Sequence, residues 1–64
     1  MTFGEKLREL RKKKEWSQEK LAAKSGVPQV AISHYECGDY VPTVTTLEWL
    51  VKALDTTATE LLGF

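Results

Sequence analysis

Cysteine and histidine are almost absent from this 64-residue chain, which contains one of each, Cys37 and His34. A single cysteine excludes an internal disulfide and a cysteine-based metal cluster, and a single histidine excludes a histidine pair. The sequence therefore predicts no metal site and no cofactor. Its apolar runs fall far short of the roughly 18 residues that span a bilayer, and it begins without an apolar signal segment. We expect a cytoplasmic protein with no membrane partner.

Net charge is also absent, because nine basic residues balance nine acidic ones. A neutral chain at first argues against a nucleic-acid partner. The charges are nevertheless separated along the sequence: residues 1–24 hold eight of the nine basic residues and carry a net +4, whereas residues 25–64 carry a net −4. The basic part is either a solvated helix surface or a surface that faces an anion, and composition leaves both interpretations open.

Strand-like patterns are missing as well. Polar and apolar residues alternate only between Tyr40 and Thr46, where Pro42 and the threonines argue against a strand. Helical spacing predicts five helices instead, in a single domain over residues 1–64, and hence an all-α fold. A chain this short buries only about 60% of the surface that its unfolded form exposes, so a partner subunit would add stability.

Capping residues mark the predicted helices. Thr2 and Glu5 are expected to form a capping box, and Ser17 is expected to cap the second helix. Thr57 and Glu60 are expected to form another box. The predicted helices cover Phe3–Lys14, the residues from Ser17 to Ser25, those from Pro28 or Gln29 to Gly38, those from Thr43 to Leu54, and those from Thr57 to Leu62. The fourth of these helices carries an apolar stripe of Val44, Leu47, Leu50, Val51 and Leu54.

Residues 17–37, SQEKLAAKSGVPQVAISHYEC, are the most informative segment. Gly26 ends one short helix, Val27 fills the corner and Pro28 starts another, which is the helix-turn-helix pattern. Such a unit leaves one helix with a free polar face that fits a DNA major groove. Helical spacing turns Ile32 and Tyr35, with Ala31 and Glu36, toward the body. The outward residues are Gln29, Val30, Ser33, His34 and Cys37.

The outward residues suit the reading of bases. Gln29 lies in the first turn, where its amide can bond N7 and N6 of adenine, and Val30 can contact a thymine methyl. Ser33 and His34 lie one turn further on and can reach another base or a phosphate. The opposing interpretation is an ordinary helix surface. Ser33 and His34 are not a catalytic pair, since adjacent helical residues point about 100° apart, and we expect no enzymatic activity.

The start of the second predicted helix suits a phosphate. Its free N–H groups and positive dipole end lie at Ser17 and Gln18. We expect the Gln18 side chain to bond the DNA backbone and also to brace Gln29. The simpler interpretation is that Ser17 only caps the helix; the two are compatible, because one cap does not fill every free N–H.

Several motifs follow one another at spacings that together identify a family. They are Leu7-Arg8-Glu9-Leu10-Arg11, Ser17-Gln18-Glu19-Lys20-Leu21-Ala22, Gly26-Val27-Pro28-Gln29, Ile32-Ser33-His34-Tyr35-Glu36-Cys37-Gly38, Pro42, Thr46-Leu47 and Ala53-Leu54. With these motifs the chain closely resembles the Cro/phage-repressor (Xre-type) helix-turn-helix family from Phe3 to Leu62. The resemblance implies a compact five-helix, lambda-repressor-like domain that binds double-stranded operator DNA, usually as a homodimer, to regulate transcription as a repressor.

The resemblance also implies roles for individual residues. Arg11 and Glu36 would form a structural ion pair that orients the third helix against the first. Tyr40 is added to the phosphate contacts for its hydroxyl and its loop position alone. The resemblance assigns base reading to Gln29, Val30, Ser33 and His34, and phosphate contacts to Ser17, Gln18, the backbone of Cys37, and Thr43.

Departures from the family pattern suggest weak binding by this domain alone. Pro28 replaces a polar cap, Val30 and Ala31 replace small polar residues, and Asp39 is acidic where the loop is often basic. Arg or a polar residue is also common where His34 and Cys37 stand. Each lost phosphate contact lowers the salt dependence of binding by about one unit of slope. The rival hypothesis is a protein-interaction module, antitoxin-like or scaffold-like, that keeps this fold with little or no operator binding.

Aromatic and basic residues outside the motif have simpler explanations. Trp16 is expected in the core, and Lys12–Lys14 are expected to complement the negative end of the first helix. Trp49 turns partly outward, and tryptophan is enriched at protein interfaces. We expect a homodimer surface on the fourth helix and C-terminal segment, formed by Trp49, Val51, Leu62 and Phe64.

Overall fold

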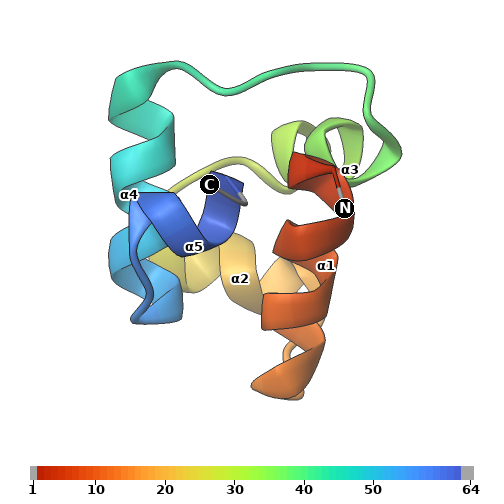
Figure 1. Ribbon diagram of the computed structural model, residues 1–64. Helices are drawn as coiled ribbons and strands as arrows, with labels where there is room; N and C mark the ends of the chain where they lie inside the picture. The colour runs from red at the N-terminus through yellow and green to blue at the C-terminus, as the bar shows by residue number, and fades with distance from the viewer. Residues whose placement is uncertain (1, 63–64) are drawn as a thin grey trace.

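The computed structural model describes residues 2–62, and within that range it contains five helices and no strand. The predicted all-α, five-helix class is therefore confirmed. Helix α1 packs against α3 and α5, α2 packs against α3 and α4, and α5 also contacts α4 (Figure 1). The helices are α1 (Phe3–Lys13), α2 (Gln18–Ser25), α3 (Gln29–Cys37), α4 (Val44–Leu54) and α5 (Ala58–Leu62).

Each helix contributes one fully buried side chain to a shared core. These side chains are Leu7, Leu21, Ile32, Leu50 and Leu61. Trp16, expected in the core, is half-buried and packs against it. All five helices therefore depend on one another, and α3 is held from behind by aliphatic packing while its other side stays open.

The apolar stripe of α4 is narrower than the sequence predicted. Leu50 and Leu54 are buried and Leu47 and Val51 pack against the core, but Val44 is 73% exposed. A helical side chain leans toward the N-terminus of its helix. Val44 is the first residue of α4, so it leans toward the connecting loop rather than the core.

Three predicted caps are present. Thr2 and Glu5 form the reciprocal capping box of α1. The Ser17 hydroxyl accepts a hydrogen bond from the Lys20 N–H at 3.0 Å. Thr43 accepts from Thr46 N–H at 3.3 Å at the start of α4. Because each cap satisfies backbone groups that its own helix leaves free, the helix starts are readable from local sequence.

Two predictions about helix termini are wrong: the last residue of α1 and the full capping box at the start of α5. α1 ends at Lys13, with Lys14 as its C-cap, because the next residue, Glu15, has a φ of 60° and leaves the helical region. The second capping box is half-formed. The Glu60 N–H donates to Thr57 Oγ1 at 3.0 Å, but the Glu60 carboxylate accepts from the Thr56 hydroxyl at 2.9 Å, a competing partner one residue earlier.

The turn between α2 and α3 is built as the sequence predicts. Gly26 has a φ of 80°, which a residue with a Cβ adopts only under strain, and its N–H donates to Ala22 O at 2.9 Å. Val27 is buried in the corner. Pro28 is the N-cap of α3 and supplies no side-chain hydrogen bond, so the first turn of α3 keeps free N–H groups.

Gly4 allows α1 to approach the end of α3 closely. A Cβ placed there would collide with the backbone carbonyl oxygen of Tyr35 and crowd that of Glu36. Sequence analysis assigned no role to Gly4. Its small size sets the separation of the two helices at the end where α3 meets the following loop (Figure 1).

Candidate nucleic-acid interface

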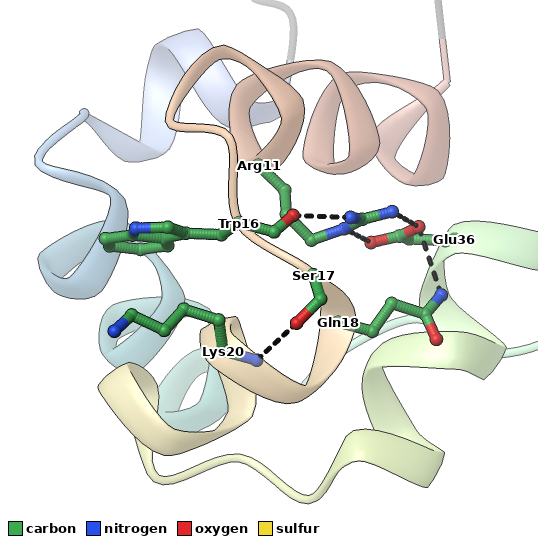
Figure 2. A network of polar contacts seen from close by, with 6 residues as sticks. All are labelled: Arg11, Trp16, Ser17, Gln18, Lys20 and Glu36. Atoms are coloured by element: carbon green, nitrogen blue, oxygen red, sulfur yellow. Dashed lines mark hydrogen bonds and ion pairs between the residues drawn. The ribbon is translucent and has the colours of Figure 1, made fainter.

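A buried set of polar groups, here called the polar junction, lies between α1, α2 and α3 (Figure 2). Arg11 Nε and Nη2 donate to the two carboxylate oxygens of Glu36 at 2.7 and 3.0 Å. Arg11 Nη1 donates to the Trp16 carbonyl oxygen at 2.7 Å. Gln18 Nε2 donates to Glu36 Oε1 at 3.2 Å. The junction thus joins α3 to both preceding helices.

The ion pair implied by the family resemblance, Arg11–Glu36, is the centre of this junction. The side chains are only 10% and 5% exposed. Hydrogen bonding by the Glu36 carboxylate, more than the opposing effect of burial, raises the pKa of Arg11 above its ordinary value. A planar guanidinium bound by two parallel hydrogen bonds fixes direction as well as distance. The pair therefore sets the orientation of α3 relative to α1.

Gln18 has a different partner from the one expected. Its amide donates to Glu36 rather than bracing Gln29. The carboxylate is the stronger acceptor and is already fixed by Arg11, whereas Gln29 is exposed at the other end of α3. Gln18 thereby connects the N-terminus of α2, where a phosphate was expected, to the body of α3.

The outward side of α3 carries the expected base-reading residues at different depths. Gln29 and Val30 are exposed in the first turn, and Cys37 is exposed at the far end. Ser33 and His34, predicted to face outward, are half-buried. Two of the three exposed side chains therefore lie beside the free N–H groups of the first turn, where a recognition helix meets base edges.

His34 is tied to the loop that follows α3. Its Nδ1 lies 3.3 Å from Asp39 Oδ2, and its ring centroid lies 4.5 Å from that of Tyr40. We call these three residues the His34 cluster. Sequence analysis treated Asp39 only as a charge that opposes DNA. The missed signal was its place after Gly38, whose φ of 85° folds the chain back onto the last turn of α3.

The residues expected to contact phosphates lie at the ends of elements around α3. Ser17 and Thr43 are exposed N-caps of α2 and α4, and both hydroxyls already accept backbone N–H groups. Tyr40 is exposed in the loop that crosses from α3 to α4 (Figure 1). These side chains thus lie at the surface, and their contacts with DNA stay predictions.

Basic and aromatic side chains outside α3 behave as the sequence suggests. Lys12 and Lys13 lie in the last turn of α1, and Lys14 Nζ sits 5.4 Å from the centre of the Trp16 ring. Trp49 is 47% exposed on α4. Its expected neighbours Val51 and Leu62 are half-buried, and Phe64 lies outside the described residues.

Two kinds of feature, a metal-ligand cluster and a membrane-spanning helix, are absent from the described part of the chain. Within residues 2–62 there is no cluster of three or more His, Cys, Asp or Glu side chains able to hold a metal ion. Over the same residues, none of the helices combines the length and apolarity needed to cross a membrane.

Two short helices joined through Gly26, with the second held from behind and open in front, define a helix-turn-helix domain. Comparison with known proteins agrees. The chain belongs to the helix-turn-helix family, whose family model matches residues 7–61. The predicted membership of the Cro/phage-repressor type is confirmed.

Curated relatives share this domain within longer proteins. The chain is 41% identical over 59 residues to the HTH-type transcriptional regulator AnsR of Bacillus subtilis (strain 168), covering 92% of this chain and 51% of AnsR. It is 40% identical over 63 residues to the HTH-type transcriptional activator BcrR of Enterococcus faecalis, covering 98% of this chain and 31% of BcrR. The chain therefore spans about half and about a third of their lengths.

Two solved structures match over nearly their whole length. The restriction-modification controller protein C.AhdI from Aeromonas hydrophila is 38% identical, with a TM-score of 0.89, covering 94% of this chain and 91% of that chain. The P22 c2 repressor, solved in complex with synthetic operator 9T in the presence of Tl+, is 37% identical, with a TM-score of 0.91, covering 97% and 94%. At these identities the likeness extends beyond the fold to the family.

Proposed function

We propose that residues 1–64 act as one sequence-specific DNA-binding domain of a transcriptional regulator of the repressor kind, working in the cytoplasm without enzymatic activity of its own. The observation that carries the proposal is the mounting of α3. The polar junction and the core hold its inner side, while Gln29 and Val30 stand exposed in an uncapped first turn. The likeness to the P22 c2 repressor, which was solved with operator DNA, supports insertion of α3 into the major groove.

Base reading is assigned to the outward side of α3. Gln29 pairs with an adenine edge and Val30 contacts a thymine methyl, with Ser33 and His34 reading a turn further along. Phosphate contacts hold the domain in register, and they are assigned to Ser17, Gln18, the Cys37 backbone, Tyr40 and Thr43. Because the phosphate contacts other than the Cys37 backbone lie outside α3, substitutions should separate affinity from specificity.

A second copy of the chain completes the binding unit. Trp49, 47% exposed on α4, offers an interface residue, and Val51 on the same helix and Leu62 on α5 are half-buried. A symmetric dimer would read two half-sites about 34 Å apart, one turn of the duplex. Sedimentation equilibrium should show a dimer that Trp49→Ala weakens and that Glu48→Ala, on an exposed neighbouring position, leaves intact.

Selection from a random duplex pool, followed by binding measurements, tests the proposal. Gln29→Ala should lose about 1–3 kcal/mol on the selected site and relax one base pair. Thr59→Ala, an exposed change on α5 away from the assigned DNA contacts, is the control and should bind like wild type. Wild-type affinity should fall steeply as salt rises. If the wild-type chain binds no duplex even at low salt, the protein-interaction alternative replaces this proposal.

A further inference from the structure

The contact between His34 and Asp39 determines where the imidazole proton lies. Asp39 Oδ2 lies 3.3 Å from His34 Nδ1, and the side chains are 62% and 38% exposed. An ionised carboxylate can only accept hydrogen bonds. His34 Nδ1 must therefore be the donor. In a neutral imidazole the other nitrogen, Nε2, is then an acceptor with a free lone pair.

The Nε2 atom is not fully buried. Within residues 2–62, the hydrogen-bond partner of the His34 ring is at Nδ1. No buried side-chain nitrogen or oxygen in that range lacks a partner, so Nε2 is not among the buried atoms. Tyr40 lies against the ring at 4.5 Å between centroids and limits its rotation. The Glu36 carboxylate, two residues along α3, is turned toward Arg11 on the side where α1 and α2 pack.

We propose that Asp39 is a positioning residue that holds neutral His34 as the Nδ1–H tautomer, so that Nε2 accepts a hydrogen bond from a base amino group in the major groove. The groups that fit are the N6 amino group of adenine and the N4 amino group of cytosine. This inference rests on the proposed function, because His34 must face DNA. It gives the acidic residue of the loop a specificity role in place of a lost phosphate contact.

The tautomer is measured without DNA. Long-range proton–nitrogen correlation spectra at about pH 8, where an imidazole in water is neutral, report which ring nitrogen carries hydrogen. Wild type should show hydrogen on Nδ1. Asp39→Ala should shift the ring toward the mixture of a free imidazole. Asp39→Asn should lie between that variant and wild type, because its amide can accept a hydrogen bond from Nδ1–H but can also donate one to a bare Nδ1. Both variants lose the same charge, so their difference isolates the hydrogen bond.

Base preference is measured at the same pH on the selected site and its single-base variants. Wild type should favour adenine or cytosine over guanine or thymine at one position by about 2- to 10-fold, the range of a single hydrogen bond. Asp39→Ala and His34→Ala should both lose that preference, and Asp39→Asn should keep part of it. Gln29→Ala should leave it unchanged while relaxing a different base pair.

Two results overturn the inference while DNA binding stays intact. One is a wild-type ring with hydrogen on Nε2. The other is an Asp39→Ala variant whose base preferences equal those of wild type. A wild-type chain that binds no duplex is a distinct outcome, since it removes the proposed function and the reading role together, whatever the tautomer.

Discussion

The polar junction and the His34 cluster both tie α3 to its surroundings through an acid paired with a nitrogen base, yet they differ in burial. The Arg11–Glu36 side chains are 10% and 5% exposed, whereas those of His34 and Asp39 are 38% and 62% exposed. Breaking a buried pair leaves an unpaired charge in the interior, while water and salt screen an exposed pair. The junction therefore sets where α3 lies, and the cluster sets how one side chain on it points.

Arg11→Ala should produce the largest effect, because it leaves the Glu36 carboxylate buried with Gln18 alone as a donor. We expect a loss of about 3–5 kcal/mol in the free energy of unfolding, measured by urea denaturation. Arg11→Lys, which keeps the charge but loses the two-pronged geometry, should fall between that variant and wild type. Lys6→Ala, which breaks the more exposed Lys6–Glu9 pair, with side chains 24% and 38% exposed, is the control and should change little. Equal losses from both alanine variants would erase the distinction between buried and exposed pairs.

Gly4→Ala should come next, because the added Cβ meets the backbone of α3 rather than a flexible side chain. Such overpacking costs about 1–3 kcal/mol of unfolding free energy, read from the shift in thermal midpoint. Gly38→Ala offers the contrast beside the His34 cluster, where a Cβ has open space but the φ of 85° is unfavourable. Its loss should be about 1–2 kcal/mol from backbone strain alone. A harmless Gly4→Ala would show that α1 and α3 do not need their close approach.

Gln18→Ala should cost less, about 0.5–1.5 kcal/mol in urea unfolding, because Glu36 keeps both hydrogen bonds from Arg11. Gln18→Glu sharpens the test by placing a second carboxylate beside Glu36, and it should destabilise more than the alanine variant. If Gln18→Glu were as stable as wild type, Gln18 would not belong to the junction in solution.

The smallest effect should come from an exposed cap outside both regions. The Thr2 N–H, bonded to the Glu5 carboxylate at 3.0 Å, lowers the pKa of Glu5 below its ordinary value of about 4.5. A carboxyl whose pKa is lower in the folded than in the unfolded state stabilises the fold at pH values above its unfolded-state pKa. This contribution is lost as the pH falls through the folded-state pKa. Between pH 5 and 3, wild type should thus lose slightly more thermal stability than Glu5→Gln. Identical pH profiles of wild type and Glu5→Gln would show that Glu5 makes no such contribution.

Local sequence was sufficient wherever the partner lies one helical turn away. The caps at Thr2, Ser17 and Thr43 and the turn at Gly26 depend on residues within four positions, so residue type predicts them. The fifth helix shows the limit of such rules. There Thr56 competes for the Glu60 carboxylate, and nothing in the capping pattern ranks two adjacent threonines.

Contacts between distant segments needed more than local pattern. Arg11–Glu36, 25 residues apart, was expected only through the family resemblance. The partner of Gln18 and the close approach at Gly4 depend on how helices pack, which helical spacing does not specify. The same holds for Val44, which matched the apolar stripe of α4 but lies beyond the edge of the core.

Amide chemical-shift mapping of the labelled chain with a selected duplex tests the central claim most directly. The account predicts the largest changes at Gln29 and Val30, at Ser17 and Gln18, and in the loop from Gly38 to Thr43. Changes concentrated on α4 and α5, with the first turn of α3 silent, would contradict it.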